Sequence, residues 1–242
     1  EVKKLQLLAI REKETFTQEV HKEKPKVSWK EIQLPKGSKP LIEIIKNDNP
    51  PDDAVWVYKH IIDRGLDHYG DFYWSNDTYL DLNRRFIVPF YYQGSTVGYT
   101  SRIIDNNPDK PKYFTNSQPN YMYNLDVLNK KRKYLIVVEG VLDALSIDGL
   151  AVLHNKLNQQ QIDIINEFEG EIIVCPDRDR AGTTLIDQAI DNGWSVSFPP
   201  WDKNIKDCAD AVKSYGQLFT IKSIIENRVN NKVKINVLRK IA

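Results

Sequence analysis

The sequence predicts an α/β fold, mixed α+β overall, in which a smaller lobe precedes a parallel sheet flanked by helices. Residues 134–138 (YLIVV) and 171–175 (EIIVC) are continuous apolar runs, which are typical of strands buried on both faces. Helical patterns follow both runs at the spacing of right-handed crossover connections. Residues 86–104 instead indicate an antiparallel hairpin around the turn residues Gln93-Gly94-Ser95.

Length and composition restrict the class of protein. The chain has 242 residues, 41% hydrophobic and 28% charged, as is ordinary for a soluble globular protein. It has no apolar run of membrane-spanning length and no secretory signal. Its two cysteines, Cys175 and Cys208, are far apart in the chain, so we expect no zinc site and a reducing, cytoplasmic location. With a net charge of +1, nucleic-acid binding requires local basic patches.

The first half is expected to open with an arm and a helix. Residues 1–49 are rich in Lys, Glu and Gln before a stretch broken by Pro and Gly. A helix starts after Pro50, with Asp52 or Asp53 as its cap and Gly65 at its left-handed end. Its apolar face is predicted to contain Val55, Tyr58, Ile61 and Ile62.

The hairpin and the loop after it contain the first candidate ligand contacts. Pro89 indicates that its strand lies at a sheet edge or is locally broken. Lys110 and Lys112 alternate with Tyr113 and Phe114. This pattern suits a nucleotide or single-stranded nucleic acid, with cations for phosphates and rings for bases. A solvated loop with a few buried rings is the alternative.

The second half alternates strands and helices. We expect a short strand at 151–154, a helix capped by Asn158, a helix over 183–192 and a strand over 195–198. A last helix runs from about Asp207 to Tyr215. Residues 217–242 are predicted to form a helical or frayed basic tail without an assigned role.

Carboxylates follow two of the predicted strands. Glu139 comes directly after the first apolar run, and Asp177 and Asp179 follow the second. Side chains at the carboxyl ends of parallel strands meet at one edge of the sheet, where these acids would repel one another without a cation. Oxygen ligands without Cys or His favour Mg²⁺ or Mn²⁺. Two simpler alternatives are a helix-opening acid at Glu139 and a surface loop of compensating charges at residues 177–180.

Five further residues flank this acidic cluster. Asp143, one helical turn after Glu139, would bind a second ion or support the first ligands. Asp207 is either an ordinary helix N-cap or part of the metal site. His154 is expected to pack or hydrogen-bond. Arg178 and Arg180 add cations suited to phosphate.

Two sets of motifs resemble known families. The series EGVLDAL, PDRDRAG and KDCADAVKSYG resembles the Toprim fold of topoisomerases, primases and related nucleases. The preceding RRFIVPFYYQGSTVGYTSRIIDNNPDKPKYFTN, with HIIDRGL at 60–66, resembles the basic lobe of bacterial DnaG-type primases and their phage relatives. The resemblance covers about residues 55–216 and implies metal-bound catalytic acids at Glu139, Asp177 and Asp179, with support from Asp143 and Asp207. It also implies nucleotide or template contacts by Arg102 and Lys112, and by Arg84 or Arg85.

The resemblance divides the chain into an arm (1–49), a basic lobe (50–133), a Toprim domain (134–216) and a helical tail (217–242). Arg178 stands where these primases usually have glycine, and Ala209 where the cellular enzymes have a second acid. These departures leave the number of ions open and favour a phage or plasmid enzyme. Because the chain opens on Glu1 and has no cysteine-rich zinc module, we expect a zinc-binding domain to be missing upstream.

The predicted function is primer synthesis, in which ribonucleoside triphosphates are joined into short RNA on a single-stranded DNA template. Two or more Mg²⁺ or Mn²⁺ ions would serve as cofactors and a replicative helicase as partner, in a bacterial cell. A Toprim nuclease would use the same ions but leaves the basic lobe unexplained. A topoisomerase would need a tyrosine in a further domain. A non-catalytic single-strand-binding module would bind without regard to Mg²⁺.

Overall fold

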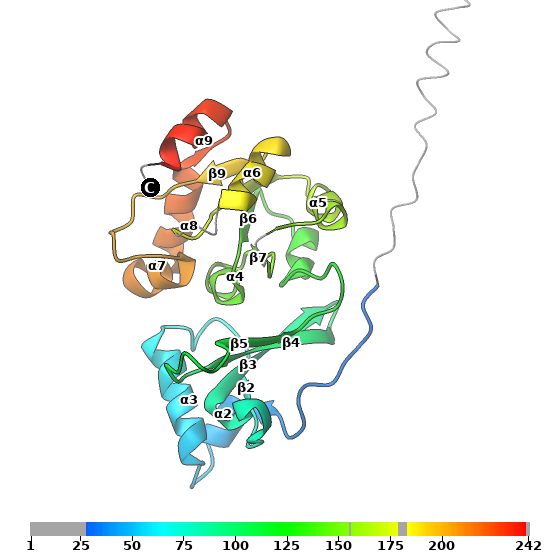
Figure 1. The fold of residues 1–242 in the computed structure, drawn as a ribbon, viewed down its shortest axis with the longest axis vertical. Coiled ribbons are helices and arrows are strands. Elements are labelled where there is room, and N and C mark those ends of the chain that lie inside the picture. Colours follow the sequence, from blue (N-terminus) through cyan, green and yellow to red (C-terminus); the bar gives the residue numbers. More distant parts are fainter. Residues whose placement is uncertain (1–27, 155, 179–182, 241–242) are drawn as a thin grey trace, which may run out of the picture.

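The computed structural model describes residues 28–154, 156–178 and 183–240, and these form two lobes (Figure 1). Each lobe contains a five-stranded sheet, which confirms the mixed α/β class. The first sheet is antiparallel throughout, in the order β1-β2-β3-β4-β5. Its strands are β1 (Lys39–Pro40), β2 (Tyr73–Trp74), β3 (Arg85–Tyr92), β4 (Ser95–Ile103) and β5 (Tyr113–Asn116).

The helices of the first lobe are α2 (Leu41–Ile45), α3 (Asp52–Asp63) and the 3₁₀ segment η1 (Tyr79–Arg84). Helix α3 ends as predicted, because Gly65 has φ +67°. Its predicted buried face is wrong in part, because Val55 and Ile62 are exposed. The residues that pack against the lobe are Ala54, Val57 and Ile61, which share one face at helical spacing.

The β3–β4 hairpin has the predicted turn. Gln93 and Gly94 both have positive φ, +48° and +85°, as the tightest hairpin turns require. Pro89 is not on an edge strand, because β3 lies in the middle of its sheet. The two-residue strand β2 pairs with β3 only at Ile87. Pro89, which has no backbone N–H to donate, lies beyond this paired position.

The second sheet has the order β10-β9-β8-β6-β7. Strands β6 (Tyr134–Val138), β7 (Leu150–Ala151), β8 (Glu171–Val174) and β9 (Ser195–Ser197) pair in parallel, as predicted. Alternate residues of β6 join different apolar clusters, one with α5 (Gln159–Ile165) and α6 (Thr183–Asp191), the other with α4 (Val141–Ile147), α7 (Cys208–Tyr215) and α8 (Gln217–Glu226). Both faces of the sheet are therefore covered, which explains its continuous apolar strands.

Residues 217–242 are more than the predicted tail. Helix α8 packs against α7, and β10 (Arg228–Val229) pairs antiparallel with β9 at the edge of the sheet. Helix α9 (Lys232–Leu238) buries Ile235 in the main apolar cluster. The 3₁₀ segment η2 (Leu125–Asn129) precedes the second sheet. No helix in the described ranges is long and apolar enough to cross a membrane.

Candidate active site

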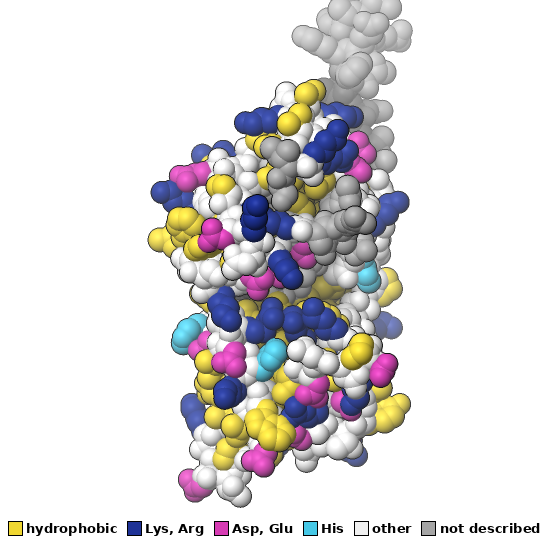
Figure 2. All heavy atoms as spheres, turned by 60° about the vertical axis from the view of Figure 1, so that its left-hand side comes forward, with side chains coloured by type: hydrophobic (Ala, Val, Ile, Leu, Met, Phe, Trp, Pro, Cys, Tyr) yellow, Lys and Arg dark blue, Asp and Glu magenta, His cyan; other side chains and the backbone are white. Residues whose placement is uncertain are grey.

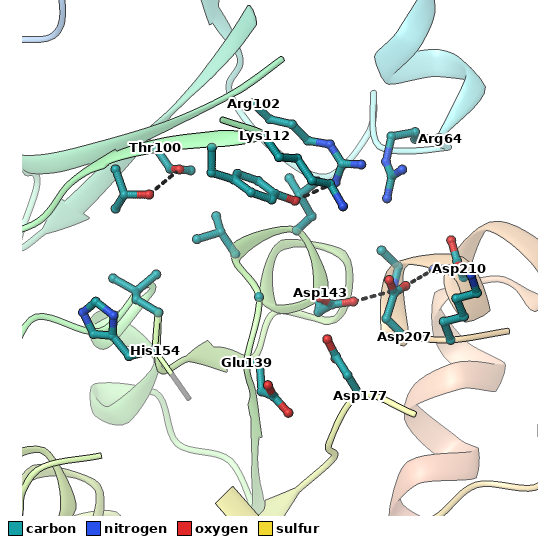
Figure 3. Close-up of a pocket in the computed structure, with 18 residues that line it drawn as sticks. Arg64, Thr100, Arg102, Lys112, Glu139, Asp143, His154, Asp177, Asp207 and Asp210 are labelled. Atoms are coloured by element: carbon teal, nitrogen blue, oxygen red, sulfur yellow. Dashed lines mark hydrogen bonds between the residues drawn. The ribbon is translucent and has the colours of Figure 1, made fainter. Parts of the chain in front are cut away.

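A pocket with a volume of about 530 Å³ lies where the two lobes meet, and side chains of both lobes line it (Figure 3). Cationic side chains from the first lobe form one wall. Carboxylates from the second lobe, together with Lys206, form the opposite wall. Figure 2 shows the corresponding band of Lys and Arg side chains across the middle of the molecule.

The acidic wall contains Glu139, Asp143, Asp177 and Asp207. Glu139 follows β6 and Asp177 follows β8, at the carboxyl ends of neighbouring parallel strands as predicted. Helix α4 begins at Val141 with Gly140 as its N-cap, so Glu139 directly precedes the cap. Its carboxylate lines the pocket, and this position beside the helix N-terminus also suits the helix dipole.

Asp143 is the most buried of these acids. Its side chain is directed back toward Gly140, where an added Cβ would lie 2.5 Å from Asp143 Oδ2, so a larger residue at this position would displace the Asp143 carboxylate. Asp143 Oδ1 accepts a hydrogen bond of 2.9 Å from the backbone N–H of Ala209 at the start of α7. Burial, and then the charges of Asp207 and Asp177, raise the pKa of Asp143 well above its ordinary value. Burial and the neighbouring acids therefore disfavour ionisation of Asp143.

Asp207 is a helix N-cap that also lines the pocket, and its part in a metal site stays a prediction. It is the N-cap of α7, because its Oδ1 accepts a 2.7 Å hydrogen bond from the N–H of Asp210. It also lines the pocket beside Asp177. Capping holds the Asp207 carboxylate at the helix start and so determines where it meets the pocket.

The chemistry of the acidic wall suits a divalent cation. Its donors are carboxylate oxygens, the ligands that Mg²⁺ and Mn²⁺ prefer, and their mutual repulsion would be relieved by a bound cation. Among the described residues, however, no three His, Cys, Asp or Glu side chains converge closely enough to hold an ion. The predicted ligand Asp179 lies outside the described residues, as does Arg180.

The basic wall consists of Arg64, Arg102 and Lys112. Arg102 is on β4, and its Nη1 donates a 2.6 Å hydrogen bond to the hydroxyl of Tyr113. Lys112 lies in the loop before β5. Burial, followed by the nearby charges of Arg102 and Arg64, lowers the pKa of Lys112. Three cations that repel one another form a site for an anion such as a phosphate.

Comparisons with known proteins agree with this geometry. Residues 136–212 match the family model described as Toprim-like, which spans both acidic strand ends and the start of α7. The chain contains a Toprim domain. Its homologues include a DNA primase of Campylobacter jejuni, 27% identical over 170 residues, and one of Clostridium acetobutylicum, 26% identical over 114 residues. These matches cover 63% and 41% of this chain but only 26% and 19% of the two relatives.

Solved structures show that the fold extends beyond the Toprim domain. The RNA polymerase domain of Mycobacterium tuberculosis primase DnaG matches with a TM-score of 0.58 at 17% identity, covering 78% of this chain and 79% of that one. A DnaG primase catalytic domain bound to single-stranded DNA matches with a TM-score of 0.57 at 16% identity, covering 77% and 74%. The two-lobed architecture is therefore that of DnaG catalytic cores. The expected phage origin stays a prediction.

Neither Arg84 nor Arg85 meets the pocket of the Toprim domain. Arg85 is fully buried, and its guanidinium donates to backbone carbonyls that include those of Pro111 at 2.6 Å and Lys112 at 3.3 Å. Because Arg85 is buried, the prediction that it contacts a nucleotide is wrong. Arg84 pairs instead with Asp53 and Asp105, at 3.0 and 2.5 Å.

Two pocket residues were missed or given another role. Arg64, the arginine of the HIIDRGL segment, lines the basic wall as the C-cap of α3. The resemblance of the HIIDRGL segment to the primase RGL turn was the sequence signal that could have pointed to Arg64. His154 is exposed and lines the pocket, which contradicts a packing role, whereas the hydrogen-bonding role that was its alternative stays a prediction. Arg178 does not line the pocket, although its motif suggested a phosphate contact.

Proposed function

We propose that this protein is the catalytic core of a DNA primase that joins ribonucleoside triphosphates into short RNA on a single-stranded DNA template. The observation that supports this most directly is the opposition of two walls in one pocket. Arg64, Arg102 and Lys112 face the carboxylates that follow β6 and β8. A polymerising site must bind the triphosphate of an incoming nucleotide as well as the metal ions, and the basic wall supplies cations for it.

The basic wall would bind and orient the nucleotide. Arg64, Arg102 and Lys112 would hold phosphates of the nucleotide or of the template, and the hydrogen bond from Arg102 to Tyr113 would keep the guanidinium in place. In the reaction, the 3′ hydroxyl of one nucleotide attacks the α-phosphate of the next, and pyrophosphate leaves. Orientation of the triphosphate along the basic wall would bring its α-phosphate to the acidic wall.

The acidic wall would hold Mg²⁺ or Mn²⁺ through Glu139, Asp177 and Asp179, with Asp143 and Asp207 as supporting acids. Bound there, the ions would lower the pKa of the attacking hydroxyl and stabilise the pentacovalent phosphate. Asp143 supports the wall through its bond to α7, and Asp207 through its position at the helix start. A replicative helicase and an upstream zinc-binding domain remain predictions from the resemblance.

One assay tests the proposal against its alternatives. The protein is incubated with labelled ribonucleotides, a pool of single-stranded templates and Mg²⁺ or Mn²⁺, with and without a supplied primer. We expect RNA extension that is lost in the Arg102→Ala and Lys112→Ala variants. The matched control is Lys131→Ala, which removes an exposed lysine outside the pocket. Template cleavage would indicate a nuclease, and binding without extension or cleavage would indicate a binding module.

A further inference from the structure

Arg178 is placed to organise the acidic wall without entering the pocket. Its guanidinium lies against one stretch of backbone and donates to four carbonyl oxygens. Nη1 reaches Trp201 O at 3.0 Å, Asp202 O at 3.1 Å and Ile205 O at 3.4 Å, and Nη2 reaches Pro199 O at 2.5 Å. These donors are directed at the protein's own backbone, which argues against the phosphate contact suggested by its motif.

The stretch that receives these bonds has no helix or strand of its own. Residues 199–206 connect β9 to α7 outside any helix or sheet ladder. Pro199 O accepts the N–H of Trp201 at 2.9 Å and Asp202 O accepts that of Ile205 at 3.0 Å. Arg178 adds a donor to each of them and also serves the carbonyls of Trp201 and Ile205. A guanidinium supplies five N–H groups in a flat fork, which can serve several separated carbonyls at once. Trp201 and Ile205 anchor the same stretch from inside, since both are buried in the apolar cluster that contains Cys208.

The backbone of Arg178 joins the same connection directly. Its N–H donates to Lys206 O at 3.0 Å. Asp177 precedes Arg178 in the chain and Asp207 follows Lys206, so both acids lie one residue from this hydrogen bond. Nearby, the buried thiols of Cys175 and Cys208 are in contact, with their sulfur atoms 3.7 Å apart. The end of β8 and the start of α7 are therefore held together beside both carboxylates.

We propose that Arg178 is a positioning residue that holds the 199–206 connection so that Asp207 stays beside Asp177. The inference rests on the proposed function, because it gives these acids the task of binding divalent ions. It explains how the chain tolerates a large cation in a motif where related primases usually have glycine. The Arg178 guanidinium points away from the candidate metal ligands and holds the loop that leads to Asp207. Its four hydrogen bonds to the carbonyls of residues 199–205 are called the clamp below.

The test compares Arg178→Gln and Arg178→Lys with the wild type and with Arg132→Gln. Arg132 is a matched control because its guanidinium also holds a residue of the Toprim domain, Asp148, but away from the pocket. Mn²⁺ affinity is measured by electron paramagnetic resonance, and hydrogen exchange is measured at the backbone amides of residues 201–206, because Pro199 and Pro200 have none. Loss of the clamp should weaken Mn²⁺ binding about tenfold and speed exchange in this connection. Arg178→Lys should behave like Arg178→Gln, because one ammonium cannot span four carbonyls.

Three results would overturn the proposal. The first is unchanged exchange across 199–206 in Arg178→Gln, whatever happens to Mn²⁺ affinity. The second is an Arg178→Lys variant equal to the wild type, since charge would then matter instead of the fork. The third is faster exchange with wild-type Mn²⁺ affinity, which would make Arg178 merely structural. If Arg178→Gln does not fold, Arg178→Lys decides by the same two measurements.

Failure of the proposed function can be told apart from failure of the clamp. A wild-type protein that bound no Mn²⁺ and extended no primer would contradict the proposed function. In that case, faster exchange confined to 199–206 in Arg178→Gln, but not in Arg132→Gln, would still show that Arg178 holds this connection, while its proposed effect on ion binding would fall with the proposed function. Normal Mn²⁺ binding and primer extension by both Arg178 variants would contradict the clamp and leave the proposed function intact.

Discussion

Arg85 in the first lobe and Arg178 in the Toprim domain lie on opposite sides of the pocket, and both bind backbone instead of lining it. Arg85 holds the loop that carries Lys112, through the carbonyls of Pro111 and Lys112. Arg178 holds the connection that leads to Asp207. Each wall of the pocket thus has one arginine that supports it from outside the pocket. The basic wall itself presents other cations to a ligand, namely Arg64, Arg102 and Lys112.

The two supports differ in burial, and this predicts different consequences of losing them. Arg85 is fully buried in the lobe, whereas Arg178 is half-buried near the surface. Removing Arg85 would leave buried carbonyls without donors, which costs folding free energy. Removing Arg178 would expose its carbonyls to water, so the main effect should be on the geometry of the acidic wall.

The largest effect is expected from the acidic wall itself. Asp177→Ala should reduce primer extension by about a hundredfold or more, because a methyl group cannot replace a carboxylate that stabilises charge at the reaction centre. Asp177→Ala with Asp179→Ala should abolish extension. Since Asp177 repels Asp143, the free energy of unfolding in urea should not fall. Wild-type extension by the double variant would show that this wall is not catalytic.

Arg85→Met should be the most destabilising change among the arginines, lowering the free energy of unfolding by about 3 kcal/mol. Its neighbour offers a matched comparison, because Arg84 makes partly exposed ion pairs with Asp53 and Asp105. Arg84→Met should cost only about 1 kcal/mol. Both are measured by urea denaturation followed by circular dichroism. Equal losses in the two variants would remove the distinction between a buried support and a surface ion pair.

Lys112→Ala should weaken binding of single-stranded DNA without a comparable loss of stability. Loss of one phosphate contact should reduce the slope of log affinity against log salt by about 0.7. Fluorescence anisotropy over a KCl series measures this slope. Lys131→Ala serves as the control, because Lys131 is exposed outside the pocket. An unchanged slope in Lys112→Ala would mean that this lysine does not meet the template.

The smallest effect is a pH-dependent one far from the acids of the Toprim domain. The hydrogen bond from Arg84 lowers the pKa of Asp105 below its ordinary value of 3.8. Such a group stabilises the fold above that value, and the contribution is lost as pH falls through the lowered pKa. Asp105→Asn should therefore cost about 0.5 kcal/mol at pH 7, after allowance for solvent screening, and progressively less below pH 4. A cost independent of pH would exclude the ion pair as its cause.

Much of the fold and part of the site could be predicted from contiguous residues. An apolar run that ends in Glu139 or in Pro176-Asp177 defines a strand and the acid at its end within a few positions. The cap at Asn158 and the left-handed stop at Gly65 are equally local, and the structure has both. The C-terminal tail was misjudged because β10 has two residues and depends on β9 for its pairing.

Only the tertiary structure could assign the arginines. A guanidinium binds whichever acceptors come within reach, and those of Arg178 lie 21 to 27 positions along the chain. For the same reason the sequence could not distinguish Arg84 from Arg85, or identify Arg64 as a member of the basic wall. Local pattern placed the acids because a strand end is a property of neighbouring residues. The roles of the cations depended on loops that only folding brings beside them.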